Sequence, residues 1–357
     1  MAPLKSGHRP SRWTTMKTLV TGGTGFVGSH LIEALRASGD SVRALVRPGS
    51  DRELLTRLGA EPVTGQLEDF ESLQAACQGV DVVYHSAARV EIIGNYADFH
   101  ETTVLGTQRL IEAARLVGVP RFVYVSSCGV YHPKLMTDRP ITEQTPTPPP
   151  PKWFVYGRAK LAAEEAVRRD VTPPMEWVVV RLGYLYGPRN RAMHRYLRPF
   201  ITGGQVMLIG DGSNEMAMLY VGDAARALVA AGRTPAAAGQ TLIAAGNERV
   251  TQRDYLNALA GGFGVPAPTR RVPYRLAFAA AWLAEYLLWF SRGDARVAIN
   301  RSAIALTGLP QRIDGSYTQQ LLGWKPQVRF DDGIRRAFDW YDREYSNAEL
   351  QAAATRS

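Results

Sequence analysis

Tyr156 and Lys160 form the residue pair with the clearest chemical potential, because they stand four positions apart in the segment WFVYGRAKLAAEEA. A spacing of four brings two side chains to the same face of a helix. A free tyrosine hydroxyl has a pKa of about 10, which is too high for efficient proton transfer near neutral pH. A neighbouring ammonium group stabilises the phenolate and lowers that pKa. The pair therefore predicts a tyrosine that exchanges a proton with a carbonyl or alcohol oxygen.

A serine hydroxyl stands where it could hold the same oxygen. The apolar run RFVYVS at 121–126 predicts a buried strand, and Ser127 follows its last residue. A tyrosine and a lysine at this spacing also occur by chance on solvated helix faces. Together with the serine and with a glycine-rich turn upstream, however, the pair matches the layout of a single site. We therefore interpret Ser127, Tyr156 and Lys160 as catalytic residues.

The glycine-rich segment TLVTGGTGFVGSHL occupies 18–31, at the first predicted junction between a strand and a helix. Gly22, Gly25 and Gly28 suit a tight turn that lets the backbone approach a pyrophosphate closely. The helix that follows would present free N–H groups to the phosphates. This context distinguishes the motif from a purely structural turn. We expect a dinucleotide-binding site here.

The residue after the second predicted strand bears on which dinucleotide binds. That strand, VRALV at 42–46, is followed by Arg47, whereas folds that select NAD commonly carry an acid near this place. An arginine can pair with a 2′-phosphate through charge-assisted hydrogen bonds. Arg47 therefore favours NADP(H). The alternative is a surface arginine balanced by Asp51 or Glu53, and it leaves NAD(H) open.

The scaffold for these residues is predicted from alternating apolar patterns. Strands are predicted at 17–21, 42–46, 80–85, 121–126 and 176–182, and helices at about 27–35, 51–58, 97–117 and 154–169. This alternation is typical of right-handed βαβ units, and the Val-rich runs suit a parallel sheet covered on both faces. We predict an α/β fold, a Rossmann-type doubly wound parallel sheet with a smaller, mainly helical C-terminal lobe that binds the substrate.

The predicted organisation has four parts. A basic tail at 1–15 precedes a dinucleotide-binding domain at 16–185, a substrate-binding lobe at 186–345 that is partly interleaved with it, and a C-terminal tail at 346–357. The run TPTPPPP at 145–151 excludes a helix or a central strand. A stiff connector is favoured there over a docking ligand or a lid.

Composition narrows the classes of protein. The chain has 357 residues, of which 45% are hydrophobic and 21% charged, which indicates a globular protein. Its net charge of +9 is not accompanied by a nucleic-acid-binding motif, so a generally basic surface is favoured over nucleic-acid binding. Cys77 and Cys128 make neither a disulfide framework nor a metal cluster, and residues 1–15 lack the apolar stretch of a secretory signal. We expect a cytoplasmic protein without a metal.

Taken in order, the motifs resemble the extended short-chain dehydrogenase/reductase superfamily of NAD-dependent epimerase/dehydratase type. The matching stretches are TGGTGFVGSHL (21–31), VYHSAA (83–88), GTQRLIEAA (106–114), VYVSSCGVY (123–131), YGRAK (156–160), YGPRN (186–190) and IGDGSNEMAMLYVGDAARA (209–227). The resemblance implies Tyr156 as general acid/base, Lys160 as the residue that tunes its pKa and binds the ribose, and Ser127 as donor to the substrate oxygen. It also implies cofactor contacts from Gly22, Thr24, Gly25, Phe26, Val27, Gly28, Arg47, Gln66, Leu67, Ser86, Ala87, Ala88, Ser126, Tyr156 and Lys160. Superfamily members often form homodimers through helices.

Within the superfamily, the chain is most similar to the 3β-hydroxysteroid dehydrogenase and dihydroflavonol reductase branch, through ALVRPGSD (44–51) and LLGWKPQVRFDDGIRRAFDWY (321–341). Three residues depart from the superfamily pattern. Thr103 replaces the usual Asn, and Gln66 replaces the Asp that usually flanks the adenine. Tyr184 stands where nucleotide-sugar epimerases usually carry a substrate-binding Asn, which argues against a nucleotide-sugar substrate.

The segment LAFAAAWLAEYLLWF at 276–290 is apolar nearly all round, apart from Glu285. A helix of this kind is buried in protein or in lipid, and it is too short to span a bilayer. Arginines flank it at Arg270, Arg271, Arg275, Arg292, Arg296 and Arg301. Two interpretations remain open. The helix lies in a membrane interface or lines an apolar substrate pocket, with the arginines meeting anionic headgroups, or it is buried in the lobe or in a dimer contact.

The sequence thus predicts an NAD(P)-dependent oxidoreductase that acts on a bulky hydrophobic hydroxy or keto compound, such as a sterol-like, polyketide-like or long-chain β-keto substrate. One alternative is a sugar-nucleotide epimerase or dehydratase that retains its cofactor. Another is a sensor or assembly protein that binds a dinucleotide without turnover.

Overall fold

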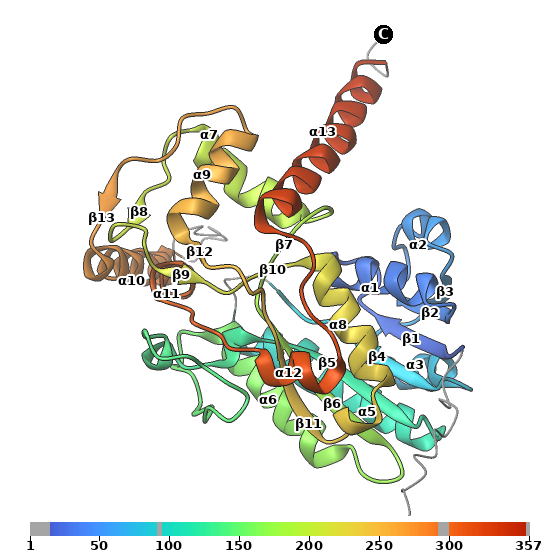
Figure 1. Ribbon diagram of the computed structural model, residues 1–357. Helices are drawn as coiled ribbons and strands as arrows, with labels where there is room; N and C mark the ends of the chain where they lie inside the picture. Colours follow the sequence, from blue (N-terminus) through green and yellow to red (C-terminus); the bar gives the residue numbers. More distant parts are fainter. Residues whose placement is uncertain (1–14, 91–94, 292–299, 355–357) are drawn as a thin grey trace, which may run out of the picture.

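The computed structural model describes residues 15–90, 95–291 and 300–354 (Figure 1). Nearly all of the expected basic tail at 1–15 lies outside these residues, as do Arg292 and Arg296. The side chain of Met16 is buried immediately before the first strand.

Within the described residues, a parallel sheet of seven strands in the order β11-β6-β5-β4-β1-β2-β3 forms the centre of the fold. Its strands are β1 (Lys17–Thr21), β2 (Ser41–Val46), β3 (Glu61–Thr64), β4 (Val82–His85), β5 (Arg121–Ser127), β6 (Glu176–Leu182) and β11 (Gln240–Ala244). The five predicted strands are confirmed. The two edge strands, β3 and β11, were not predicted, because EPVT and QTLIA are short and alternate only weakly.

Helices cover both faces of the sheet, which confirms the doubly wound α/β prediction (Figure 1). One face carries α1 (Phe26–Ala37), α8 (Val221–Arg233) and α12 (Ser316–Leu322), and the other carries α3 (Phe70–Cys77), α5 (Gly106–Leu116) and α6 (Val155–Asp170). The short α2 (Glu53–Arg57) packs Leu55 into the first of these layers. Helices α8 and α12 and strand β11 all come after residue 185. The sheet domain therefore includes segments from the C-terminal half of the chain.

The helix predicted at 97–117 is present and runs without a break, but its middle part is π-helical instead of α-helical. It consists of α4 (Tyr96–Phe99), a π-helical turn η1 (His100–Leu105) and α5. At this turn Thr107 Oγ1 donates a hydrogen bond to the Thr103 carbonyl oxygen at 2.5 Å. Such bonds between a threonine and the carbonyl four residues earlier often bend helices.

The remaining elements form a second lobe beyond the carboxyl ends of the strands. Its short strands pair as β7 (Tyr184–Tyr186) with β10 (Met218–Tyr220), β9 (Glu215–Met216) with β12 (Val250–Thr251), and β8 (Leu208–Ile209) with β13 (Arg271–Val272). Its helices are η4 (Met193–Leu197), α7 (Arg198–Thr202), α9 (Gln252–Gly262), α10 (Tyr274–Ser291), α11 (Arg301–Gly308) and α13 (Phe330–Ala354). Helix α13 continues to Ala354, past residue 345, where a tail was expected to begin.

The connection from β5 to α6 contains two 3₁₀ turns, η2 (Cys128–Val130) and η3 (Pro133–Leu135), and then an irregular stretch. The proline run at 145–151 belongs to that stretch and contains neither helix nor strand. It thus joins the serine-bearing strand to the tyrosine-bearing helix.

The apolar segment at 276–290 forms most of α10, but the chain buries only one side of it. Ala277 and Ala281 are buried on the side that faces α11. The opposite side, which we call the outer face of α10, exposes Leu276, Trp282, Leu283, Tyr286 and Leu287. Of the interpretations left open by the sequence, complete burial of this helix within the lobe is therefore excluded for the described residues, and the others stay open. No helix in the described ranges is both long and apolar enough to cross a membrane.

Candidate active site

The glycine-rich turn joins β1 to α1 in the predicted way. Gly22 has φ +71°, a conformation that favours glycine, and its carbonyl oxygen accepts a hydrogen bond from Gly25 N at 2.9 Å. A Cβ atom on Gly28 would lie 2.2 Å from the Gly22 oxygen, so only glycine allows the helix to approach the turn this closely. Gly25 precedes α1 and offers no capping side chain, which leaves the first N–H groups of the helix for an anion.

The loop after β4 lies directly against this turn. Ser86 Oγ donates to the Thr21 carbonyl oxygen at 3.0 Å, and Ala87 N donates to Thr21 Oγ1 at 3.2 Å. A Cβ atom on Gly22 would meet Ala87 N at 2.8 Å. The fold therefore brings the glycine turn and the loop at 86–88, both predicted to bind the cofactor, next to each other. Thr24 is exposed beside them, whereas Phe26 and Val27 are half-buried.

Thr21 and His85 are two buried residues that the sequence analysis missed. Thr21 Oγ1 lies 2.7 Å from His85 Nδ1, and His85 Nε2 lies 2.9 Å from Thr107 Oγ1. Burial, with a contribution from the nearby Lys160 charge, lowers the pKa of His85 to about 3, so the ring is neutral near pH 7. This chain of contacts ties the ends of β1 and β4 to α5.

The residues expected at the adenosine end follow β2 and β3. Arg47 is exposed immediately after Val46, the last residue of β2. Gln66 is also exposed, and its N–H donates to Ser72 Oγ at 3.3 Å. Leu67 is buried against Gly106. All three lie near the carboxyl ends of parallel strands, where ligands bind in open α/β sheets.

Ser127 and Tyr156 meet above the sheet, because β5 ends at Ser127 and α6 begins one residue before Tyr156. The Ser127 hydroxyl lies near enough to the Tyr156 hydroxyl to lower its pKa. Gly129 leaves room for them: a Cβ there would lie 3.3 Å from Ser127 Oγ and 3.5 Å from Tyr156 Cε1. Gly129 N also donates to Ser127 Oγ at 3.0 Å, which orients the serine.

Lys160 is buried one helical turn after Tyr156, and its ammonium group faces the strand. Its Nζ donates to the Val125 carbonyl oxygen at 2.7 Å and lies 4.8 Å from the centre of the Tyr124 ring. Burial lowers the pKa of Lys160 to about 7, and the opposing influence is the negative charge of Glu164. The lysine thus titrates near neutral pH.

In this structure Lys160 is not among the groups that shift the pKa of Tyr156, although the sequence predicted that it would lower this pKa. Burial raises the pKa of Tyr156 above its ordinary value, and the Cys128 thiol adds to that rise. The influence that lowers this pKa is the hydrogen bond with Ser127. The physical reason is geometric, because the ammonium group is turned toward Val125 instead of the phenol.

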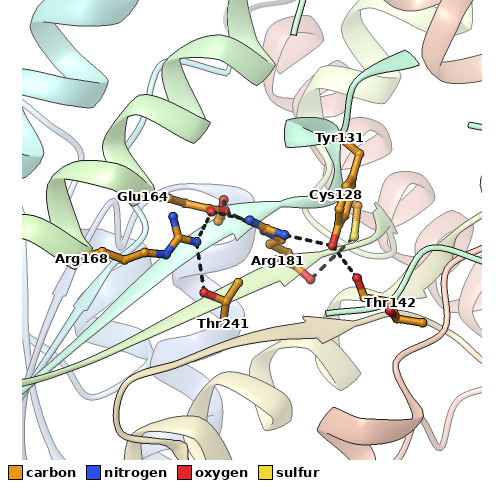
Figure 2. Close-up of polar contacts among 8 residues, drawn as sticks. Cys128, Tyr131, Thr142, Glu164, Arg168, Arg181 and Thr241 are labelled. Carbon is orange, nitrogen blue, oxygen red and sulfur yellow. Dashed lines mark hydrogen bonds and ion pairs between the residues drawn. The ribbon is translucent and has the colours of Figure 1, made fainter. Parts of the chain in front are cut away.

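A buried network beneath the site, shown in Figure 2, was also missed by the sequence analysis. Glu164 Oε1 accepts from Arg181 Nε at 3.0 Å, and Glu164 Oε2 accepts from Arg181 Nη2 at 2.7 Å and from Arg168 Nη2 at 2.6 Å. Glu164 and Arg181 are almost completely buried. Arg181 Nη1 donates to the Tyr131 hydroxyl at 2.9 Å, and that hydroxyl donates to the Thr142 carbonyl oxygen at 3.1 Å.

Burial alone would raise the pKa of Glu164. The hydrogen bonds and charge of Arg181, helped by Arg168 and Ser126, outweigh that effect and hold the pKa below its ordinary value. Since Glu164 follows Lys160 by one helical turn, its carboxylate links the catalytic helix to β5 and β6. The four-residue spacing from Lys160 was the signal that could have revealed it.

Ser126 belongs to this network. Its Oγ donates to Glu164 Oε1 at 2.6 Å, and the cofactor contact that the resemblance implied for Ser126 stays a prediction. Because side chains alternate along a strand, Ser126 and Ser127 point to opposite faces of β5.

Two departures from the superfamily pattern have structural explanations. Thr103 is buried in the π-helical turn, where its Oγ1 accepts from Arg89 N at 3.3 Å. The Tyr184 ring packs edge-on against the Tyr255 ring, with their centres 5.7 Å apart. Tyr184 therefore presents an aromatic surface at the start of the second lobe.

The described part of the chain contains no group of three or more His, Cys, Asp or Glu side chains that could hold a metal ion. Cys77 and Cys128 are free and buried, and burial raises the pKa of each thiol to about 12. Neither is a thiolate near neutral pH.

Residues 18–245 match the model of the NAD-dependent epimerase/dehydratase family. The chain belongs to this family. Curated proteins similar to this chain include a ketoreductase of Stigmatella aurantiaca that acts on 4-hydroxy-2-methyl-3-oxo-4-farnesyl-3,4-dihydroquinoline-1-oxide. That enzyme is 32% identical over 322 residues, which are 89% of this chain and 95% of the relative. A 2-alkyl-3-oxoalkanoate reductase of Stenotrophomonas maltophilia is 28% identical, over 90% of this chain and 98% of the relative.

A solved structure extends the family likeness to three dimensions. The dTDP-glucose 4,6-dehydratase of Streptomyces venezuelae, determined with NAD bound, superposes with a TM-score of 0.72 at 27% identity, covering 93% of this chain and 98% of that one. The protein is thus an extended short-chain dehydrogenase/reductase and an NAD(P)-dependent oxidoreductase. The close-packed glycine turn and the uncapped start of α1 fit a dinucleotide.

Proposed function

We propose that this epimerase/dehydratase family member reduces a ketone, or oxidises the matching secondary alcohol, in a bulky and mainly apolar molecule with NADP(H). The observation that carries the proposal is the meeting of Ser127 and Tyr156 at the carboxyl end of β5, with Lys160 buried one turn along α6. Sterol-like, polyketide-like and long-chain β-keto compounds are the substrate classes that we favour.

The residues divide the chemistry between them. Ser127 Oγ and the Tyr156 hydroxyl are placed to donate hydrogen bonds to one carbonyl oxygen, which polarises the carbonyl. In the reductive direction Tyr156 gives its proton to that oxygen, and in the oxidative direction it takes the proton back. The glycine turn and the start of α1 would hold a dinucleotide, which would supply or accept the hydride at the carbon atom. Lys160, buried one turn along α6, would bind the ribose of that dinucleotide.

Two observations support an apolar substrate. Tyr184 offers an aromatic ring in place of a substrate-binding amide, and both reductases described above act on molecules whose names include a farnesyl or alkyl chain. The chain also resembles a protein named for a nucleotide sugar, the dTDP-glucose 4,6-dehydratase described above. A sugar-nucleotide epimerase or dehydratase that retains its cofactor is therefore the second candidate.

A panel of carbonyl compounds assayed separately with NADPH and NADH tests the proposal. We expect stoichiometric loss of NADPH absorbance with long-chain β-keto or polycyclic ketones. Turnover of a nucleotide sugar without net consumption of dinucleotide, by protein purified with NAD(H) bound, would support the second candidate. Absence of hydride transfer with every compound would leave a sensor or assembly role and overturn both enzymatic candidates.

Arg47→Ser should weaken the binding of NADPH and leave the binding of NADH nearly unchanged. Because charge-assisted hydrogen bonds to a 2′-phosphate contribute roughly 1.5–3 kcal/mol, we expect KM for NADPH to rise about ten- to a hundredfold, with little change for NADH. Arg57→Ser is the matched control, since Arg57 is also exposed but pairs with Glu53 on α2. A wild-type preference for NADH, or equal effects on both dinucleotides, would refute the NADP assignment.

A further inference from the structure

We infer that the outer face of α10 binds the surface of an anionic lipid bilayer. This inference concerns where the protein binds, and it does not depend on the proposed reaction. The outer face exposes large apolar side chains along successive turns of one helix, with Leu276 62% and Leu287 59% exposed. A contiguous exposed patch of this kind, bordered by polar residues, is typical of a membrane or protein interaction surface.

The charges around the outer face favour anionic lipid as the occupant. Arg270, Arg271 and Arg275 are exposed at the N-terminal end of α10. Glu285, the one acidic residue in the sequence of α10, is not available to balance them. Its carboxylate accepts hydrogen bonds from Arg301 N and Arg301 Nε, both at 2.7 Å.

A second copy of the chain fits this surface less well. Two copies packed through the outer face would bring together apolar side chains, but α10 would offer no free carboxylate to the arginines. An anionic bilayer can contact both parts of this surface. Its acyl chains pack against the leucines, and its phosphate headgroups pair with the arginines. The lipid interface is therefore the occupant that satisfies the apolar and the charged part of the surface together.

The inner side of α10 connects this surface to the catalytic helix. The Phe278 ring lies edge-on to the Trp153 ring, with their centres 5.3 Å apart, and the Arg301 guanidinium lies 5.4 Å from the Trp153 ring centre. Ser302 Oγ donates to the Trp153 carbonyl oxygen at 3.2 Å. Since Trp153 precedes Tyr156 by three residues, binding through α10 would hold the start of α6 close to the bilayer, where apolar substrates concentrate.

Co-sedimentation of the full-length protein with vesicles tests the inference. We expect binding to phosphatidylcholine vesicles that contain phosphatidylglycerol, much weaker binding to phosphatidylcholine alone, and loss of binding as salt is raised. The variant Leu283→Glu/Leu287→Glu should weaken binding by at least about tenfold. Arg270→Gln/Arg275→Gln should weaken it by about fivefold for each arginine removed and reduce the salt dependence.

Leu116→Glu is the matched control, because Leu116 is 53% exposed on α5 and away from the outer face. It should bind vesicles like the wild type, and circular dichroism should show that all variants remain folded. Failure of the wild type to bind anionic vesicles would overturn the inference, as would equal binding by the leucine double variant. A dimer in vesicle-free sedimentation that this double variant dissociates would show that a second copy occupies the face, and would also overturn it.

Discussion

Tyr156→Phe is expected to lower turnover by about 10²- to 10⁴-fold or more while leaving the Kd for the dinucleotide nearly unchanged. The substitution removes the hydroxyl that Ser127 contacts but keeps the half-buried ring against Gly129. The glycine turn and the 86–88 loop, which we expect to hold most of the dinucleotide, do not involve Tyr156. The loss should therefore appear in kcat, and titration of NADPH fluorescence should show normal binding.

Tyr196→Phe provides the matched control for this prediction, because Tyr196 is 48% exposed on η4 and has no place in the site. It should retain wild-type turnover. Turnover of Tyr156→Phe within a few-fold of the wild type would contradict the assignment of Tyr156 as the proton donor. A large loss of dinucleotide affinity would instead indicate that the residue acts mainly through cofactor binding.

Glu164→Gln should destabilise the protein by about 3–5 kcal/mol, because it leaves the Arg181 guanidinium buried without a counter-charge. Thermal or urea unfolding with the wild type as reference would measure this loss. Arg168→Gln is the matched control. Arg168 pairs with the same carboxylate but is 31% exposed in its side chain, so its removal should cost about 1 kcal/mol.

The pH dependence separates the charge of Glu164 from its packing. Folding lowers the pKa of Glu164 from its ordinary 4.5. The stabilisation by its charge is therefore complete above about pH 4.5 and is lost as the pH falls through the lowered folded value. The stability difference between wild type and Glu164→Gln should accordingly shrink in acid. A difference of the same size at neutral and strongly acidic pH would assign the effect to packing instead.

The same variant should also change catalysis in a way that a purely structural role would not. The Glu164 charge raises the pKa of Lys160 against the effect of burial, so its removal should lower that pKa below about 7. We expect activity that depends on the Lys160 ammonium group to decline at a lower pH than in the wild type. An unchanged pH profile would limit Glu164 to holding α6 against β5 and β6.

Local patterns in the sequence were sufficient for most of the sheet domain. The apolar runs predicted five of the strands, because a buried parallel strand needs a continuous apolar segment and nothing from elsewhere in the chain. The glycine spacing predicted the turn for a similar reason, since Gly22 and Gly28 meet within one strand–helix junction. Edge strands such as β3 and β11 have weaker patterns and depend on the neighbouring strand that accepts them.

By itself, the sequence determined which residues can perform the chemistry: the serine at the end of β5, and the tyrosine and lysine one turn apart on α6. Only the tertiary structure decided how they act on one another. Lys160 turns to Val125, 35 residues away, so Ser127 becomes the group that lowers the pKa of Tyr156. Arg181 reaches Glu164 across 17 residues, and α10 buries one side and exposes the other. Such contacts depend on which elements pack together, and residue spacing along one helix or strand does not specify that.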